Sequence, residues 1–164
     1  MTGSQIPVLP ACAQDIPRLA ELRAMFLQEL KYEFDPRRCR AETEAFLAAH
    51  LNTSLHVLVA QDKDTLAACA FLLVQPQLYH PRIESGPGGE VLNVYTVPAY
   101  RNQGLAARLM QEICALAKRL GLGSLQLSAT AAGRALYEGM GFTEVKSVHP
   151  LMTLSLNCKG KSSP

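Results

Sequence analysis

The sequence predicts an α/β fold of the α+β kind: a mixed, mostly antiparallel sheet of six to seven strands with helices on both faces. Three observations predict it. In the first half, two apolar runs flank the polar turn Asp62-Lys63-Asp64, which indicates a hairpin. In the middle, a strand, an amphipathic helix and another strand follow one another, which is typical of a crossover between parallel strands. At the end, two further apolar runs indicate a closing antiparallel pair.

The first half of the chain alternates between helix and strand signals. Apolar residues at three- and four-residue spacing predict a helix that begins after Asp15, a fair N-cap, with Pro17 in its first turn. The proline-containing stretch 32–36 ends this helix. The other elements expected here are a short strand at 5–9, a helix at 40–51, and strands at 56–61 and 66–75.

The second half centres on a long amphipathic helix. Residues 76–89, with three prolines and three glycines, form the longest loop and lead into a strand at 91–97. A helix is then expected over 102–120, because an apolar stripe recurs along it and glycines follow it. The stripe consists of Leu105, Leu109, Ile113, Leu116 and Leu120. The remaining elements are a strand at 124–129, a helix at 131–140, and strands at 142–148 and 151–156.

The composition fits one globular domain. The chain has 164 residues, 48% of them hydrophobic, and we expect residues 1–158 to form a single domain and 159–164 a disordered tail. No apolar run approaches the roughly 18 residues of a membrane span, and the first residues lack the pattern of a secretory signal. A cytoplasmic location and no membrane partner are therefore expected. The net charge of +2 is too small to indicate nucleic acid binding.

The cysteines and histidines indicate neither a disulfide framework nor a metal centre. The cysteines are Cys12, Cys39, Cys69, Cys114 and Cys158, an odd number without a C-x-x-C pair. Cys69 and Cys114 lie in apolar patterns and are expected as small core residues. The four histidines form no cluster with metal-ligand spacing, so no metal is expected.

The turn at residues 101–106 is the strongest chemical signal in the sequence. Its pattern, Arg-x-x-Gly-x-Ala, stands between a strand and the start of the long helix. The first N–H groups of a helix have no partners and the dipole end is positive, so this turn indicates a site for phosphate or pyrophosphate. Gly104 lacks the Cβ that would obstruct such a ligand. A Walker loop does not occur, and Gly104 lacks the companion glycines of a dinucleotide fingerprint.

Two motifs resemble those of the GNAT superfamily of N-acetyltransferases. Pro98, Arg101, Gly104 and Ala106 match the family's acyl-CoA-binding pattern V-x-P-x-x-R-x-x-G-x-G/A, with Thr96 at the Val position. Residues 136–142, Leu-Tyr-Glu-Gly-Met-Gly-Phe, look like the family's L-Y-x-x-x-G-F. The order of the expected elements also agrees. The resemblance therefore covers nearly the whole chain, and it implies a GNAT-like fold with acetyl-CoA as co-substrate.

The resemblance also implies which residues hold acetyl-CoA. The backbone amides from Asn102 to Ala107 would hold the pyrophosphate, that is, those of Asn102, Gln103, Gly104, Leu105, Ala106 and Ala107, and Arg101 of the same motif is also expected among the cofactor-binding residues. The pantetheine arm would pair with the main chain of Val94, Tyr95 and Thr96, one of whose N–H groups would polarise the thioester carbonyl. Thr130 stands where the family often has Asn, and it is included among the cofactor-binding residues although its reach is shorter.

Two residues are candidates for proton transfer. By resemblance, Tyr137 would donate a proton to the departing CoA thiolate; the alternative is a tyrosine that packs the short helix. Glu90 could take the amine proton through water, or it could be a solvated strand end. Asn93 and Tyr95 would lie on the face opposite Glu90 in a regular strand, but the family often has a bulge here, which would break the alternation. The loop candidates for acceptor contact are Glu33, Asp35, Tyr79, His80, Arg82 and Glu84.

The function that follows is acetyl transfer from acetyl-CoA to a primary amine by direct attack, without an acyl-enzyme. The partner of such an acyltransferase is a small-molecule or peptide amine. A non-catalytic module of the same fold that senses acyl-CoA is the alternative, and a nucleotide-binding protein that uses the same turn is a third. The presence of Tyr137 favours the enzyme. The sequence does not clearly mark a general base, so the non-catalytic module remains an alternative. Because the family often forms dimers, a homodimer is also an expectation.

Overall fold

The computed structural model describes residues 5–156. The chain forms one compact unit up to Ser128 and a second from Ala129 onward. Of the described residues, those of the first unit contain the sheet and three long helices, and those of the second contain one short helix, α4 (Arg134–Gly139).

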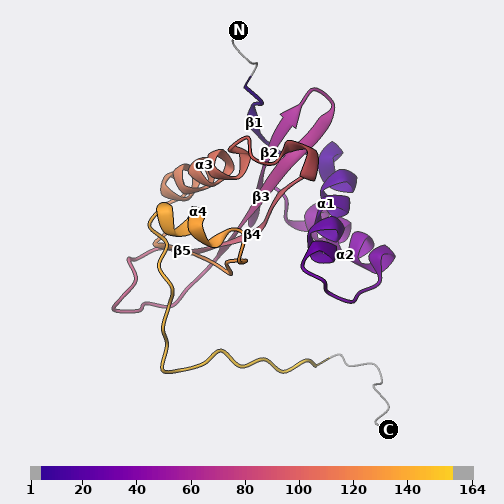
Figure 1. Ribbon diagram of the computed structural model, residues 1–164. Coiled ribbons are helices and arrows are strands. Elements are labelled where there is room, and N and C mark those ends of the chain that lie inside the picture. Colours follow the sequence, from indigo (N-terminus) through magenta and orange to yellow (C-terminus); the bar gives the residue numbers. More distant parts are fainter. Residues whose placement is uncertain (1–4, 157–164) are drawn as a thin grey trace. The chain divides into compact units, whose positions relative to one another are not determined.

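The first unit is built on a five-stranded sheet in the order β1-β2-β3-β4-β5 (Figure 1). The strands are β1 (Val8–Pro10), β2 (Leu55–Asp62), β3 (Thr65–Gln75), β4 (Gly88–Thr96) and β5 (Ser124–Leu127). The first four pair antiparallel, and β4 pairs with β5 in parallel through a helical crossover. The prediction of a mixed, mostly antiparallel sheet is confirmed, with five strands in the described residues instead of six to seven.

Helices cover both faces of this sheet, as predicted. Helices α1 (Ile16–Glu29) and α2 (Pro36–His50) lie on one face, and α3 (Leu105–Arg119) lies on the other (Figure 1). Short 3-10 turns, η1 (Ala13–Asp15) and η2 (Pro98–Tyr100), precede α1 and follow β4. Strand β4 lies between β3 and β5 in the sheet and contacts both α1 and α3.

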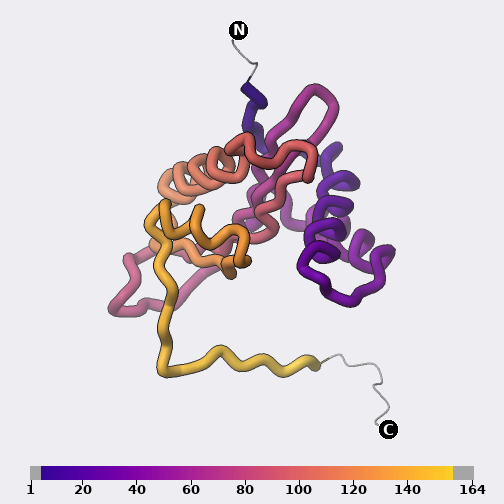
Figure 2. The backbone as a smooth tube through the Cα atoms, in the orientation of Figure 1, coloured from indigo at the N-terminus to yellow at the C-terminus, as the bar shows by residue number. Residues whose placement is uncertain are grey.

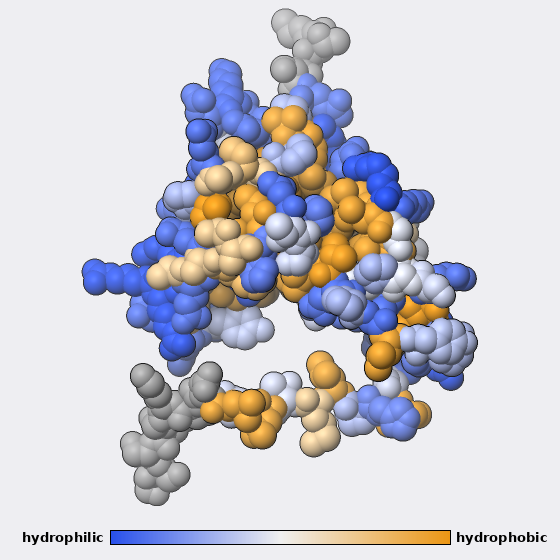
Figure 3. Space-filling model, turned by 180° about the vertical axis from the view of Figure 1, so that it is seen from behind, coloured by the Kyte–Doolittle hydropathy of each residue, from blue (hydrophilic) through white to orange (hydrophobic). Residues whose placement is uncertain are grey.

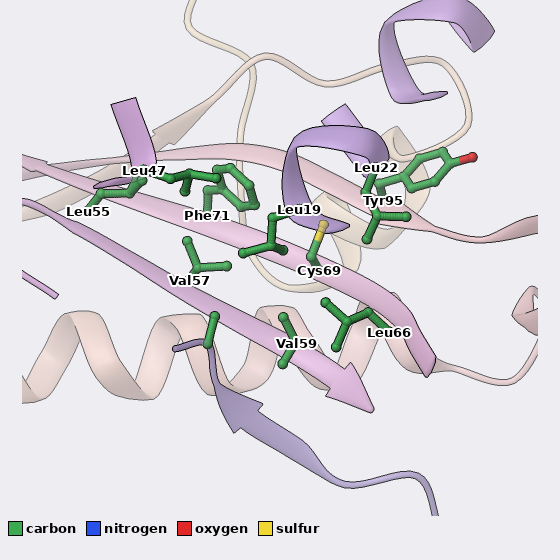
Figure 4. Packing of buried hydrophobic residues seen from close by; sticks show 11 residues of the cluster. Leu19, Leu22, Leu47, Leu55, Val57, Val59, Leu66, Cys69, Phe71 and Tyr95 are labelled. Atoms are coloured by element: carbon green, nitrogen blue, oxygen red, sulfur yellow. The ribbon is translucent and has the colours of Figure 1, made fainter. Parts of the chain in front are cut away.

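The core under α1 and α2 is a cluster of buried side chains from both helices and from β2, β3 and β4. Figure 4 shows Leu19 and Leu22 of α1 packed against the sheet, in one cluster with Cys69 and Phe71 of β3. The ring of Tyr95 closes the cluster, and its hydroxyl points out of it. Because side chains alternate along a strand, the residues between these positions point to the face that α3 covers.

Local sequence explains where the helices begin. The expected start of α1 after Asp15 is confirmed, but the expected side-chain cap is wrong: the Asp15 carboxylate accepts a hydrogen bond from the Cys12 N–H at 2.8 Å instead of from an N–H of α1. Helix α2 begins at Pro36, four residues earlier than predicted, because the Asp35 carboxylate accepts a hydrogen bond from the Arg37 N–H at 2.9 Å and caps the helix. Helix α3 begins at Leu105 instead of residue 102, because Asn102 and Gly104 have φ of +61° and +73°, which a right-handed helix cannot include.

The expected closing strand pair is wrong for the structure as described. Residues 143–156 have no helix or strand, and their apolar side chains are exposed along an extended segment (Figure 3). Leu151, for example, is 96% exposed. Alternating apolar residues predict a strand only if another strand supplies its hydrogen bonds, and the sequence pattern does not identify that partner. The predicted tail at 159–164, like Cys158, lies outside the described residues.

Among residues 5–156, no helix is long and apolar enough to cross a membrane.

Candidate functional site

Strand β4 carries a bulge at its centre. Leu92 lies opposite Phe71 and Tyr95 lies opposite Cys69, so β4 has one residue more than β3 over this stretch. Asn93 accommodates the extra residue with φ of +51°, a left-handed value that asparagine tolerates better than most residues. The bulge foreseen from the resemblance is therefore present.

The bulge brings three candidate residues to one face of the sheet. Glu90 lies opposite Leu73, which packs against the α1/α2 core, so Glu90 is on that face. After the bulge, Asn93 contacts Arg23 of α1, and the ring of Tyr95 lies in the same core. In a regular strand, Asn93 and Tyr95 would have pointed away from Glu90. Because of the bulge, all three side chains lie on the face that α1 and α2 cover, and Asn93 and Tyr95 contact α1.

The second half of β4 has an open edge on its β5 side. The pairing between the two strands ends at Val91 and Leu127, while β4 continues to Thr96. Within the described part of the first unit, residues 92–96 have no strand partner on that side. Unpaired backbone groups on a strand edge can bind an extended ligand as an added strand. This edge includes Val94, Tyr95 and Thr96, the residues expected to pair with pantetheine.

The turn that follows β4 has the backbone of an anion site. Asn102 and Gly104 both have positive φ, and Gly104 is the N-cap of α3. The Arg108 N–H donates to the Gly104 carbonyl at 3.1 Å, so the helical hydrogen bonds begin there, and the preceding N–H groups of 105–107 have no carbonyl of their own helix. A Cβ built at Gly104 would meet no atom within 4 Å. The turn is thus exposed, with free donors at the positive end of a 15-residue helix.

The side chain of Arg101 faces the protein. Its guanidinium donates to both Glu29 oxygens, at 2.6 and 2.8 Å, and to the Thr96 carbonyl at 3.0 Å. It also lies 5.7 Å above the ring of Tyr95. These contacts fix the turn to α1 and to the end of β4. They leave the backbone of Arg101, more than its charge, to face a ligand.

Tyr95 is held in the same contact. Its hydroxyl donates to Glu29 at 2.9 Å, and its ring packs edge-on against Phe26 with centroids 5.9 Å apart. Burial, and then the hydrogen bond to Glu29, raise the pKa of Tyr95 to about 12. The side chain is therefore neutral and structural, and only its main chain is available to a cofactor.

Glu90 lines a polar pocket of about 210 Å³ at the ends of β3, β4 and β5. The side chains of Gln75, Gln77, Ser124 and Gln126 surround it. Glu90 is half-buried, so its carboxylate has both solvent contact and polar neighbours. This placement suits a base that works through water, and it equally suits a solvated strand end.

The long loop before β4 forms a second, adjoining hollow of about 190 Å³. It brings together Tyr79, His80 and Glu84, three of the predicted acceptor-contact residues. The loop leaves the sheet after β3 and rejoins it at β4 (Figure 2). Near its end it contacts the turn between α3 and β5, where the Gly123 N–H donates to the Pro87 carbonyl at 2.9 Å. A Cβ at Gly123 would lie 2.0 Å from the Glu84 carbonyl oxygen, so only glycine permits this approach.

A third pocket, of about 490 Å³, lies between α1 and α2. It includes Glu33 and Asp35, the other acidic residues predicted to border an acceptor site, together with Arg23. Asp35 is also the cap of α2. Arg23 donates to the Asn93 side-chain oxygen at 3.2 Å, so this pocket adjoins the β4 bulge.

The second unit holds Thr130 and Tyr137. The Thr130 hydroxyl accepts a hydrogen bond from the Gly133 N–H at 3.2 Å, in the turn before α4. Tyr137 is 8% exposed, its ring packs edge-on against Phe142, and burial raises its pKa. A Cβ at Gly133 would lie 2.8 Å from the Tyr137 ring, so glycine makes room for this tyrosine. The phenol is thus protonated at neutral pH and able to donate.

Two predictions about cysteine differ in outcome. Cys69 is fully buried, as expected for a core residue, and burial raises its pKa to about 12. Cys114 is only half-buried, because it lies at the border of the apolar face of α3. Throughout residues 5–156, no three His, Cys, Asp or Glu side chains gather as they would around a metal ion.

Sequence comparison establishes the family. The model of the acetyltransferase (GNAT) family matches residues 19–142, more than half of the chain. The chain therefore belongs to this family. No curated protein sequence matches it.

Solved structures with the same fold agree. A predicted acetyltransferase from Clostridium acetobutylicum, whose crystal structure contains acetyl-CoA, has a TM-score of 0.76 at 21% identity, over 89% of this chain and 95% of the other. A GCN5-related N-acetyltransferase from Ralstonia eutropha has a TM-score of 0.70 at 24% identity, over 89% and 97%. Glucosamine-6-phosphate N-acetyltransferase from Arabidopsis thaliana has 0.65 at 14%, over 91% and 98%. At these identities the likeness concerns the fold.

Three residues of this region were missed in the sequence: Arg23, Glu29 and the role of Asn93. Arg23 and Glu29 lie six residues apart on a helix whose apolar stripe is the only pattern that local sequence reveals, and their partners are about 70 residues away in the chain. Asn93 offered a signal, because asparagine is unusual inside a strand and tolerates the left-handed conformation of a bulge.

Proposed function

We propose that this protein transfers the acetyl group of acetyl-CoA to a primary amine. The amine nitrogen attacks the thioester carbon, a C–N bond forms, the C–S bond breaks, and CoA leaves as the thiolate. The thiolate takes a proton from Tyr137, and the amine loses one to water or to Glu90. No acyl-enzyme is required, because the buried Cys69 thiol stays protonated and the structure places no base beside it.

The observation that carries this proposal is the continuity of β4 and the turn. An open strand edge at 92–96 runs directly into a turn with two positive-φ residues and the free N–H groups of α3. An extended arm that ends in a pyrophosphate has this shape and this charge, which is the chemistry of CoA. The acetyl-CoA bound in the Clostridium structure supports the same choice.

Within this proposal, the turn binds the phosphates and β4 positions the thioester. Backbone N–H groups aimed at the thioester oxygen stabilise the negative charge that develops there during attack. The amine would approach from the α1/α2 face, because Glu90 and the bulge face that side and the pocket between the two helices adjoins it. Carboxylates at Glu33 and Asp35 would attract an ammonium group before it loses its proton.

A thiol-release assay tests the function. The purified protein is incubated with acetyl-CoA and each member of a panel of polyamines, amino acids, aminoglycosides and peptides, and free CoA thiol is measured beside the mass of the acetylated amine. We expect amine-dependent release for at least one class. CoA binding without turnover on any amine would favour the non-catalytic module. Tighter binding of ATP or NAD than of CoA would favour a nucleotide-binding protein and contradict the proposal.

A further inference from the structure

The bulge residue Asn93 is held by two groups that the proposed reaction does not use. Its side-chain oxygen accepts a hydrogen bond from Arg23 at 3.2 Å, and its side-chain nitrogen lies 3.5 Å from the Cys69 sulfur. The Cys69 thiol in turn donates to the Asn93 carbonyl at 3.6 Å. Arg23 of α1 therefore binds the side chain of Asn93, and Cys69 of β3 contacts both its side chain and its main chain.

These contacts are buried, so water does not compete for the hydrogen-bonding groups. Asn93 is 5% exposed, and Cys69 is fully buried. Because burial raises the pKa of the Cys69 thiol to about 12, the thiol keeps the proton that it donates to the Asn93 carbonyl. A buried amide with all its partners in place has one orientation, since any rotation would leave a polar group unsatisfied.

Because Asn93 is held in this way, the backbone that follows it in β4 is held as well. Asn93 directly precedes the stretch 94–96, in which alternate N–H groups point to the open edge of β4. A bulge rotates the peptide groups that follow it, so the orientation of Asn93 sets the direction of those N–H groups. An oxyanion donor that is misdirected by about 1 Å loses much of its effect.

We propose that Asn93 is a positioning residue, and that Arg23 and Cys69 hold its amide so that the β4 bulge directs a backbone N–H at the thioester carbonyl. The inference rests on the proposed function. The inference goes beyond the proposed function because it gives Arg23 an indirect role: Arg23 orients Asn93, and Asn93 orients the backbone N–H that would face the thioester. Arg23 also lines the α1/α2 pocket, so the same side chain borders the acceptor side of the bulge.

Three variants distinguish the role of the Asn93 side-chain amide from that of the backbone conformation at the bulge. Asn93→Gly keeps a residue that adopts positive φ without strain but removes the amide. Asn93→Asp keeps the shape and an oxygen acceptor for Arg23. Arg23→Met removes the donor and leaves Asn93 in place. Arg18→Met is the matched control, because Arg18 lies on the same helix and pairs with Glu21 at the surface.

We expect Asn93→Gly and Arg23→Met to lower kcat about 10- to 100-fold while KM for acetyl-CoA changes less than about threefold. Asn93→Asp should recover most of the lost kcat, and Arg18→Met should behave as wild type. A role confined to stability would lower the melting temperature of Asn93→Gly and Arg23→Met with kcat of the folded enzyme unchanged, and that result would overturn the inference.

A spectroscopic measurement makes the test independent of turnover. Acetyl-CoA labelled with ¹³C at the thioester carbonyl is bound, and its C=O stretch is recorded by difference infrared spectroscopy. We expect the bound wild type to shift the stretch to lower wavenumber and Asn93→Gly to lose most of that shift. An equal shift in both overturns this inference and leaves the proposed function intact. Failure of the wild type to bind acetyl-CoA overturns both.

Discussion

Replacing Gly104 with glutamate is the most direct test of the phosphate turn. Gly104 has φ of +73° and ψ of 12°, so any side chain there adds about 1–2 kcal/mol of backbone strain. Space is not the obstacle, because a Cβ at this position meets no atom within 4 Å. The glutamate therefore has room, and its Cβ is placed at the N-cap of α3, beside the first N–H groups of that helix. What changes for a bound CoA is the charge.

The size of the effect follows from Coulomb's law. A carboxylate about 6 Å from one phosphate charge costs about 0.7 kcal/mol in bulk water and about 3 kcal/mol at an effective dielectric constant of about 20. A pyrophosphate carries more than one charge, so the exposed turn should fall above the lower value. We expect CoA binding to weaken at least tenfold, about 1.4 kcal/mol.

Calorimetric titration with CoA measures this change, with Gly104→Gln as the control. Glutamine has the same size and suffers the same strain at positive φ, so the difference between the two variants isolates the charge. That difference should shrink as salt rises from about 0.05 to 0.5 M, because the site is exposed. Unchanged CoA affinity in a folded Gly104→Glu protein would refute the assignment of the turn.

Three further predictions follow from the site. Tyr137→Phe keeps the ring that packs on Phe142, and it should lower kcat about 10- to 1000-fold with KM for acetyl-CoA changed less than about threefold; steady-state kinetics with full turnover would make Tyr137 structural. Glu90→Gln should lower turnover and flatten the acid limb of the pH–rate profile with CoA affinity kept, whereas a wild-type profile would return Glu90 to a solvated strand end. Tyr95 has its pKa raised from 10.0 to about 12, so its neutral form stabilises the fold below about pH 10, and this contribution is lost as pH rises to about 12. Tyr95→Phe should therefore reduce the decline in the free energy of unfolding over that range, measured by urea denaturation, and an unaltered decline would assign it to other groups.

Local sequence patterns predict most of the elements and the kind of site. The apolar stripe of α3, the polar turn between β2 and β3, and the stop at residues 32–36 are local signals, so they predict an element from the residues within it. The phosphate turn is local as well, because the free donors of a helix start and a left-handed glycine depend on a few consecutive residues. For the same reason, two short motifs were enough to indicate the family that the comparison established.

Tertiary structure decided what those residues face. Arg101 matches a cofactor motif, yet its guanidinium binds Glu29, 72 residues away, because only folding brings α1 beside the end of β4. The face on which Glu90, Asn93 and Tyr95 lie depends on one extra residue at the bulge, and a shift of one residue reverses every later side chain. The expected closing strands show that a local pattern alone is not enough to predict a strand. Their apolar residues alternate, but a strand forms only against the edge of another strand, and no sequence pattern specifies which edge that is.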